Sequence, residues 1–224
     1  MLERKYVRMK IGIVTEMSTA LRNKDVYNAL VQATEGMGHE IINFGMTGPE
    51  DEVLNYLMNG YITGLMLNLG RVDFMIGGCG TGTGYINAAL AFPNVSATMC
   101  LEPIDAWLFP QINDGNCISL ALNKGYGWAA ENNLVFMFEK LFDPSLKAAG
   151  YPKERKEIQN ELARKLTQYS VATHKSMADC TRLLDQKLVH DALHHHDVWE
   201  TVDIDNVEDE DLKEALIAAY NYAE

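Results

Sequence analysis

Residues 72–84 read VDFMIGGCGTGTG, and this stretch decides the fold that we expect of the 224-residue chain. The apolar run at 72–77 is typical of a strand buried in a parallel sheet. A glycine-rich loop then leads to a helix expected from Tyr85. Five glycines lie within residues 77–84, more than a tight turn needs, and such a backbone can approach a ligand closely. We expect a ligand site here and disfavour the alternative, a turn without a ligand.

Apolar runs and amphipathic stretches alternate on both sides of this unit. Strands are expected at residues 10–15, 40–44, 72–77, 95–100 and 117–122, and helices at 23–38, 50–69, 85–91, 103–111 and 128–141. Strands separated by helices predict right-handed crossovers. The fold class is therefore α/β, a three-layer, Rossmann-like, doubly wound parallel sheet of five strands.

The pattern changes after residue 142, where no further strand is expected. Residues 153–174, 177–190 and 208–223 have helical patterns. We therefore divide the chain into a Rossmann-like domain at 1–142 and a helical extension at 143–224. Ten acidic residues and one basic residue lie at 197–224, so this tail carries −9 of the formal net charge of −12.

Composition excludes several classes of protein. A pI near 4.9 offers no basic patch for a nucleic-acid backbone. No stretch approaches the roughly 18 consecutive apolar residues of a membrane span. The first ten residues have no apolar segment typical of a secretory signal, so a cytoplasmic protein is expected. Four cysteines without CxxC spacing predict reduced thiols.

Cys79 is the first candidate for chemistry, because it lies in the glycine-rich loop. A following helix and backbone N–H groups favour the thiolate, which can act as a nucleophile or as a base. His39 is the one histidine before residue 170, and it lies far along the chain, so proton transfer is favoured over nucleophilic attack. The loop contains no P-loop lysine, and its glycines do not fit a GxGxxG dinucleotide motif in register.

Other polar residues are expected around the sheet. Glu16 follows the first strand and either faces the ligand crevice or begins the next helix. The Asn-Asp-Gly-Asn segment at 113–116 is expected at the same rim, with an Asx turn as the alternative. The histidines at 190 and 194–196, with Asp197, suggest a metal site because His190 and His194 have helical spacing, but the site is disfavoured because no acid completes an HExxH pattern.

Several motifs together resemble the ribose-5-phosphate isomerase B / galactose-6-phosphate isomerase family over residues 9–155. They are MKIGI at 9–13, GHEIINFG at 38–45, CGTGTG at 79–84, CLEP at 100–103 and NDGN at 113–116. The resemblance implies an aldose–ketose isomerase that needs no metal or organic cofactor. It also implies a homodimer, or a dimer of dimers, with active sites shared between subunits.

The resemblance also assigns roles to individual residues. Cys79 matches the base that moves a proton between C1 and C2, and Thr81 matches the threonine that assists it. Asn113 matches a substrate-binding asparagine, and Arg155 the second arginine of a phosphate clamp. The anion hole for the enediolate is matched by the backbone of Gly80, Gly82, Thr83 and Gly84.

This sequence departs from the family at several of these positions. The Asp-His pair after the first strand is Glu16-Met17, and the ring-opening histidine is Ile112. Tyr151 stands where the family has the first arginine of the phosphate clamp. Lys153 is expected to replace the positive charge of that missing arginine. We therefore expect a sugar phosphate that needs little ring opening, such as a short-chain one, with Glu16 shuttling the hydroxyl proton. A substrate without phosphate stays open.

Two other hypotheses follow from the same observations. The lost histidines and arginine are also consistent with a non-catalytic sugar-phosphate-binding protein. Apolar helix faces after Asp143 are consistent with a role of the extension in assembly.

Overall fold

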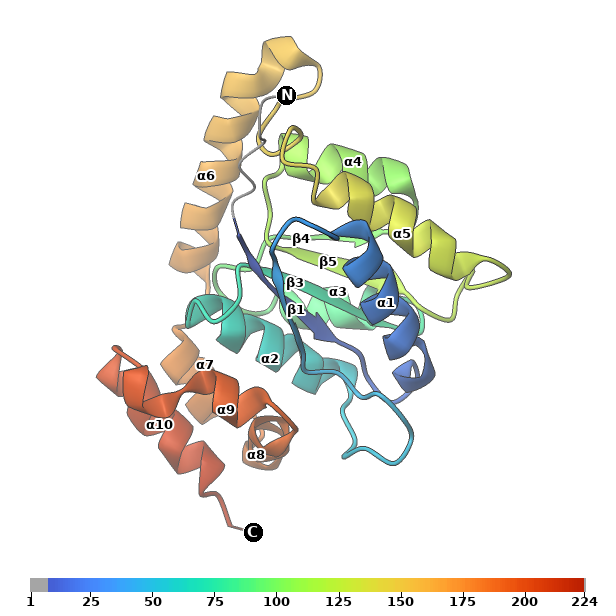
Figure 1. Ribbon diagram of the computed structural model, residues 1–224. Helices are drawn as coiled ribbons and strands as arrows, with labels where there is room; N and C mark the ends of the chain where they lie inside the picture. Colours follow the sequence, from blue (N-terminus) through green and yellow to red (C-terminus); the bar gives the residue numbers. More distant parts are fainter. Residues whose placement is uncertain (1–7, 224) are drawn as a thin grey trace.

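The computed structural model describes residues 8–223, which form a five-stranded parallel sheet with helices on both faces (Figure 1). The strands lie in the order β2-β1-β3-β5-β4. Their bounds are β1 Lys10–Val14, β2 Glu40–Asn43, β3 Phe74–Cys79, β4 Ala97–Cys100 and β5 Cys117–Ala121. The expected fold class is confirmed, and β3, which carries Cys79, lies at the centre of the sheet.

The two faces of the sheet bury separate apolar clusters. Helices α1 (Asn23–Ala33), α4 (Pro103–Ile112) and α5 (Ala130–Leu141) cover one face, where Ile13, Ile76 and Phe138 are fully buried. Helices α2 (Tyr56–Asn68) and α3 (Thr83–Ala89) cover the other face. Because side chains alternate along a strand, Met75, Gly77 and Cys79 share this second face.

Helix α2 begins six residues later than expected from the sequence. The Asp51 carboxylate accepts hydrogen bonds from the backbone N–H groups of Thr47 and Gly48, which holds the preceding segment in a turn. Asn55 then caps the helix by accepting from the N–H groups of Leu57 and Met58. The polar start of the expected helix is therefore a loop at the carboxyl edge of the sheet.

The extension is helical, as expected, but more broken than its pattern suggested. It contains η2 (Lys153–Arg155), α6 (Lys156–Thr173), α7 (Met177–Leu183), α8 (Gln186–His194), α9 (Val198–Val202), η3 (Ile204–Asn206) and α10 (Glu210–Tyr220). The single helix expected at 177–190 is wrong, because Asp185 caps a new helix at the N–H of Leu188. The acidic residues at 208–211 begin α10, where Asp209 is the N-cap.

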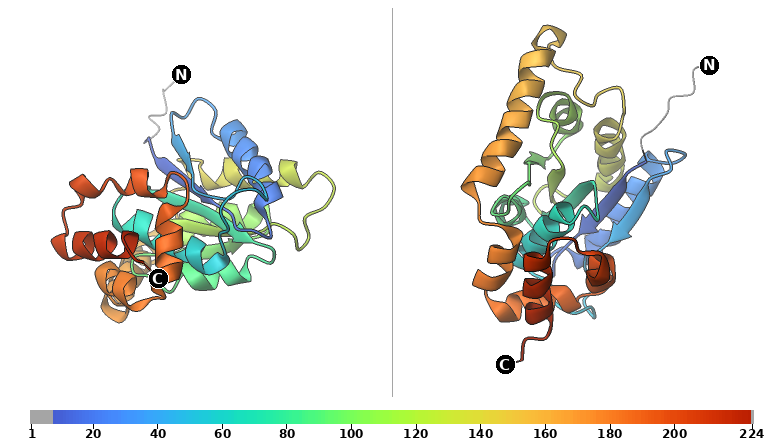
Figure 2. Two further views of the ribbon diagram at one scale, coloured as in Figure 1. Left: turned by 90° about the horizontal axis from the view of Figure 1, so that it is seen from below. Right: turned by 90° about the vertical axis from the view of Figure 1, so that its left-hand side faces the viewer.

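Helices α7 to α10 gather beside α2, whereas α6 lies along one side of the molecule with most of its surface uncovered (Figures 1 and 2). Met177, Val189 and Leu216 of the extension belong to the same apolar cluster as Ile62 and Leu65 of α2. The extension is thus built onto the face of the sheet that carries Cys79. Its description as a separate domain stays a prediction.

Within residues 8–223, no helix is long and apolar enough to span a lipid bilayer.

Candidate active site

Cys79 is the last residue of β3 rather than part of the loop that follows. Its backbone carbonyl accepts hydrogen bonds from the N–H groups of Gly82 (3.2 Å) and Leu122 (3.1 Å), so the turn begins at this residue. The side chain is 7% exposed, and its Sγ lies 4.0 Å from the Thr81 hydroxyl. The thiol and the threonine that the sequence paired are therefore brought together.

Glycine is required at two positions around this turn. Gly82 has a φ of +77°, and a Cβ there would lie 2.6 Å from the Met99 sulfur. A Cβ at Gly77 would lie 2.0 Å from the Tyr85 ring. The carbonyl of Gly80 accepts hydrogen bonds from the N–H groups of Asn123 and Lys124, which holds the loop against the end of β5. The loop is thus a packed and fixed structure rather than a loose connection.

Glu16 lies beside this loop, at the carboxyl end of β1. Val14 pairs with Gly77 in the parallel register, so Glu16 is level with Cys79 on the neighbouring strand. Its side chain is 4% exposed, and its carboxylate accepts hydrogen bonds from both the backbone N–H and the hydroxyl of Ser18. The carboxylate is therefore held at the rim that contains Cys79.

Tyr56 is a rim residue that the sequence analysis missed. Its ring packs against Gly84, where a Cβ would lie 3.2 Å from the ring, and it stays 45% exposed. The sequence carried a signal for it, because Asn55 is a typical N-cap and would have placed Tyr56 at a helix start. The aromatic side chain thus borders the glycine-rich loop.

Asn113, Lys153 and Arg155 do not lie at this rim, and the expectation that residues 113–116 share it is wrong. Asn113 caps the end of α4 and precedes β5, so it lies at the amino edge of the sheet. Segment 148–155 is attached to the same place, because the Ala148 and Gly150 N–H groups donate to carbonyls at the end of α4. A five-residue strand spans roughly 17 Å, so the edge on which these residues lie is about the length of a strand away from the edge that carries Cys79.

The thiols of Cys100 and Cys117 are structural. Burial raises the pKa of each to about 12, which keeps both protonated at neutral pH. Cys117 contacts the Tyr85 hydroxyl at 3.4 Å, and Cys100 contacts the Met137 sulfur at 3.4 Å. Both cysteines therefore act as small buried side chains.

The histidines that the sequence singled out lie in different places, and His195 lies near the carboxyl edge, where the charge of Asp51 acts on it. His39 lies at the amino edge, where its Nδ1 accepts from the Met9 N–H. The rings of His190 and His194 contact each other in α8 at 3.9 Å between centroids, tilted by 35°. In the described part of the chain, no group of three histidine, cysteine or acidic side chains is arranged to hold a metal ion.

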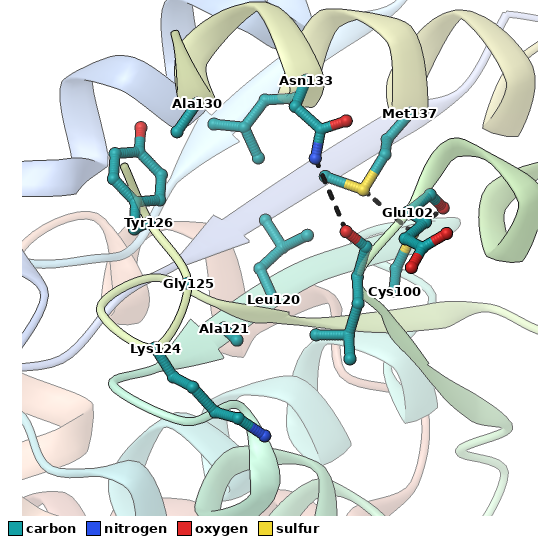
Figure 3. Close-up of a pocket in the computed structure, with 12 residues that line it drawn as sticks. Cys100, Glu102, Leu120, Ala121, Lys124, Gly125, Tyr126, Ala130, Asn133 and Met137 are labelled. Atoms are coloured by element: carbon teal, nitrogen blue, oxygen red, sulfur yellow. Dashed lines mark hydrogen bonds between the residues drawn. The ribbon is translucent and has the colours of Figure 1, made fainter. Parts of the chain in front are cut away.

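A cavity of about 230 Å³ lies near the carboxyl ends of β4 and β5, on the face covered by α5 (Figure 3). Its lining includes Cys100, Leu120 and Met137, and Lys124 points away from it. Leu120 and Met137 belong to the apolar cluster opposite to that of Cys79. The apolar part of this cavity therefore lies on the face opposite to Cys79, and its lining reaches the glycine-rich loop at Lys124, whose N–H donates to the Gly80 carbonyl.

The sequence matches the Ribose/Galactose Isomerase family model over residues 12–141. A search of curated protein sequences returned no match. A ribose-5-phosphate isomerase from Vibrio parahaemolyticus is 37% identical, covers 95% of this chain and 100% of its own, and superposes with a TM-score of 0.88. A 4-deoxy-L-threo-5-hexosulose-uronate ketol-isomerase complexed with a tartrate is 35% identical, covers 96% and 100%, and also has a TM-score of 0.88.

A more distant structure shows the fold alone. The type B ribose 5-phosphate isomerase of Leishmania infantum is 15% identical, with a TM-score of 0.61, and covers 75% of this chain and 99% of its own. The two similar structures above extend over nearly all of this chain, whereas this one leaves a quarter uncovered. By its sequence and its fold, the chain belongs to the ribose/galactose isomerase family of sugar isomerases.

Proposed function

We propose that the protein is a ketol-isomerase that interconverts the aldose and ketose forms of an open-chain sugar acid, with Cys79 as the base. The observation that carries this proposal is the carboxyl edge of the sheet. There, the Cys79 thiol and the Thr81 hydroxyl contact each other, and the buried Glu16 carboxylate lies at the end of the neighbouring strand. These groups suit a proton transfer next to a carbonyl.

The substrate class follows from what the site lacks compared with its family. Ile112 stands where the resemblance places a ring-opening histidine, and Tyr151 where it places a clamp arginine. A 4-deoxy-5-hexosulose-uronate has no hydroxyl at C4 and a ketone at C5, so neither position can close a sugar ring on C1. Such a compound needs no ring opening and carries a carboxylate instead of a phosphate. The 35%-identical ketol-isomerase, which covers nearly the whole chain, supports this choice.

In the proposed reaction, the Cys79 thiolate removes the proton from C2 of the aldehyde form. The electron pair moves to O1, and backbone N–H groups of the glycine-rich loop, other than that of Gly82, which donates to the Cys79 carbonyl, stabilise the resulting enediolate. Glu16 moves the hydroxyl proton from O2 to O1. Cys79 then returns its proton to C1, which gives the ketose and regenerates the thiolate.

We propose that a second copy of the chain completes the site. Asn113, Lys153 and Arg155 are exposed at the amino edge, roughly 17 Å from the edge that carries Cys79, too far for one small substrate to reach both. The subunit sharing implied by the family resemblance would place these residues of one copy beside Cys79 of the other. The substrate carboxylate would then bind to Arg155 or Lys153.

Hydrogen exchange tests this proposal. The protein is incubated in D2O with 4-deoxy-L-threo-5-hexosulose-uronate and, separately, with tetrose, pentose and hexose phosphates, and the C1 and C2 protons are followed by NMR. We expect deuterium uptake with the uronate that disappears in Cys79→Ala. Exchange that persists in Cys79→Ala would contradict the role of the thiol.

A sugar phosphate is the second candidate substrate, favoured by the 37%-identical ribose-5-phosphate isomerase and by the two cationic residues at 153 and 155. Exchange with a phosphate and not with the uronate would select it. Binding without exchange of any compound would favour the non-catalytic alternative, a sugar-phosphate-binding protein.

A further inference from the structure

Asn59 of α2 carries a buried amide that the structure does not satisfy. Its side chain is 0% exposed, and neither its nitrogen nor its oxygen has a hydrogen-bond partner within residues 8–223. Burying an unpaired amide opposes folding, and an apolar residue of similar size would fit such a place at lower free energy. Because the buried amide of Asn59 destabilises the folded state, its presence suggests a role other than stabilising the fold.

Its neighbours place this amide beside the candidate site. Tyr56, one turn earlier in α2, packs on Gly84, and Thr63, one turn later, exchanges a hydrogen bond of 2.8 Å with Tyr85. Gly60 packs against Ala88 of α3. Asn59 therefore lies on the flank of α2 that faces the start of α3, which directly follows the glycine-rich loop.

The direction of the helix sets how far along the sheet the amide lies. Helix α2 runs opposite to the strands, and the Met66 carbonyl at its far end accepts from the Arg71 N–H, just before β3. Asn59 is two turns closer to the carboxyl edge than Met66, on the same side of the helix. This places it in the layer between α2, α3 and the end of β3, and the Cys79 side chain belongs to the apolar cluster of that layer.

We propose that Asn59 is a positioning residue for Cys79, and that its amide N–H₂ donates a hydrogen bond to the Sγ when the sulfur is a thiolate. The proposal rests on the proposed role of Cys79 as the base. A neutral thiol is a weak acceptor, whereas a thiolate is a strong one. Among the residues that the structure describes, the Asn59 nitrogen has no acceptor, sulfur included, within hydrogen-bond reach, so the Asn59 or the Cys79 side chain must change rotamer for the pair to form. The amide is then unpaired in the resting protein and paired in the charged state, and its cost in stability is offset by stabilisation of the charged sulfur.

The test combines thermal unfolding with the pH profile of Cys79 alkylation by iodoacetamide, assigned to Cys79 by peptide mass spectrometry. We expect Asn59→Leu to raise Tm by about 2–6 °C, because it removes an unpaired buried amide. We also expect the midpoint of its alkylation profile to move to higher pH by about one pH unit or more, because the thiolate loses its donor. Asn59→Ala serves as a second variant if the leucine is not accommodated.

Thr63→Val is the matched control, because it removes a paired hydroxyl one turn away on the same helix. It should lower Tm and leave the alkylation midpoint unchanged. A wild-type alkylation profile in both Asn59 variants would overturn the proposal and leave a structural or water-binding amide. Neither readout requires turnover, so failure of the proposed isomerase activity would show separately, as absence of Cys79-dependent exchange.

Discussion

The two edges of the sheet differ in what they offer a substrate. The carboxyl edge holds a buried thiol, a buried carboxylate and a fixed glycine-rich loop, and the thiol belongs to the apolar cluster formed with α2 and α3. The amino edge holds the exposed side chains of Asn113, Lys153 and Arg155 on segments attached to the end of α4. The first set is suited to moving a proton, and the second to holding an anion.

Under the proposed function, a single copy of the chain separates these two tasks by about the length of a strand. The extension reaches both edges, because it lies along α2. At the amino edge, the Arg71 guanidinium donates to the carbonyls of Val202, Asp203 and Asn206. At the carboxyl edge, the charge of Asp51 acts on His195. The predictions below test the two edges first and then the two ends of the extension.

The largest effect is expected at the carboxyl edge. Cys79→Ala removes the proposed base, and we expect kcat to fall by about 10³-fold or more, since general base catalysis contributes 10²–10⁴-fold. Cys79→Ser keeps the shape but supplies a much weaker base, so it should be almost as slow. The measurement is the exchange rate of the C2 proton. Comparable losses in Cys100→Ala, whose thiol is structural, would point instead to misfolding.

A smaller effect is expected at the amino edge. Arg155→Ala should lower kcat/KM by roughly 10- to 100-fold, mainly through KM, because it removes the charged hydrogen bond that we propose to the substrate anion. Lys153→Ala should have a lesser effect of the same kind.

Mixing subunits then tests whether the two edges meet between copies. If they do, a hybrid dimer of Cys79→Ala and Arg155→Ala subunits contains one site with both defects and one intact site. Half of the dimers in an equal mixture are hybrids, so the mixture should recover about a quarter of wild-type activity. If the mixture shows no activity above the mean of the two variants, the carboxyl edge of one copy and the amino edge of the other do not form a shared active site.

The fold could be predicted from the sequence because its strands are short apolar runs and its helices fill the intervals. The error at residues 113–116 has a simple cause. A segment before a parallel strand lies at the opposite edge from a segment after one, and the motif was assigned to the wrong edge. The break at Asp185 was missed because the apolar pattern continues through it, and the cap depends on one side-chain hydrogen bond.

The candidate site was predicted in part. Cys79, Thr81 and Glu16 could be found because the loop composition marks them and the topology brings β1 beside β3. Asn59 could not be found, because an asparagine in a helical pattern is usually at the surface. Its significance depends on full burial and on the lack of a partner, and both are properties of the packed layers rather than of the sequence.

The amino-edge end of the extension should matter for stability more than for catalysis. Arg71→Ala removes three hydrogen bonds to backbone carbonyls, and we expect a loss of about 1–2 kcal/mol in the free energy of unfolding, because the site is partly solvated. Urea unfolding followed by circular dichroism measures it. Arg71→Lys retains the charge without the planar donors and should recover less than half of the loss. An unchanged midpoint in Arg71→Ala would show that apolar packing alone holds the extension.

The smallest effect is expected at the other end, as a dependence of stability on pH. Burial, and then the neighbouring charge of His196, lowers the pKa of His195 to about 4, against the opposing effect of Asp51. The unfolded chain has the higher pKa and therefore binds more protons between about pH 6.5 and pH 4. The contribution of a neutral His195 is thus fully present above the unfolded pKa and is lost as the pH falls toward 4. With solvent screening, we expect a loss of about 1 kcal/mol by pH 5.

The matched variant for this prediction is His195→Leu, because both ring nitrogens of the buried histidine lack partners within residues 8–223. We expect the variant to be at least as stable at pH 7 and to lose less stability between pH 7 and pH 5. His39, whose pKa burial also lowers, contributes equally to both proteins and cancels in the comparison. If both proteins lose the same stability between pH 7 and pH 5, the loss arises from protonation of groups other than His195. A flatter profile in the variant would show that protonation of His195 weakens the packing of the extension beside the loop that leads to Tyr56.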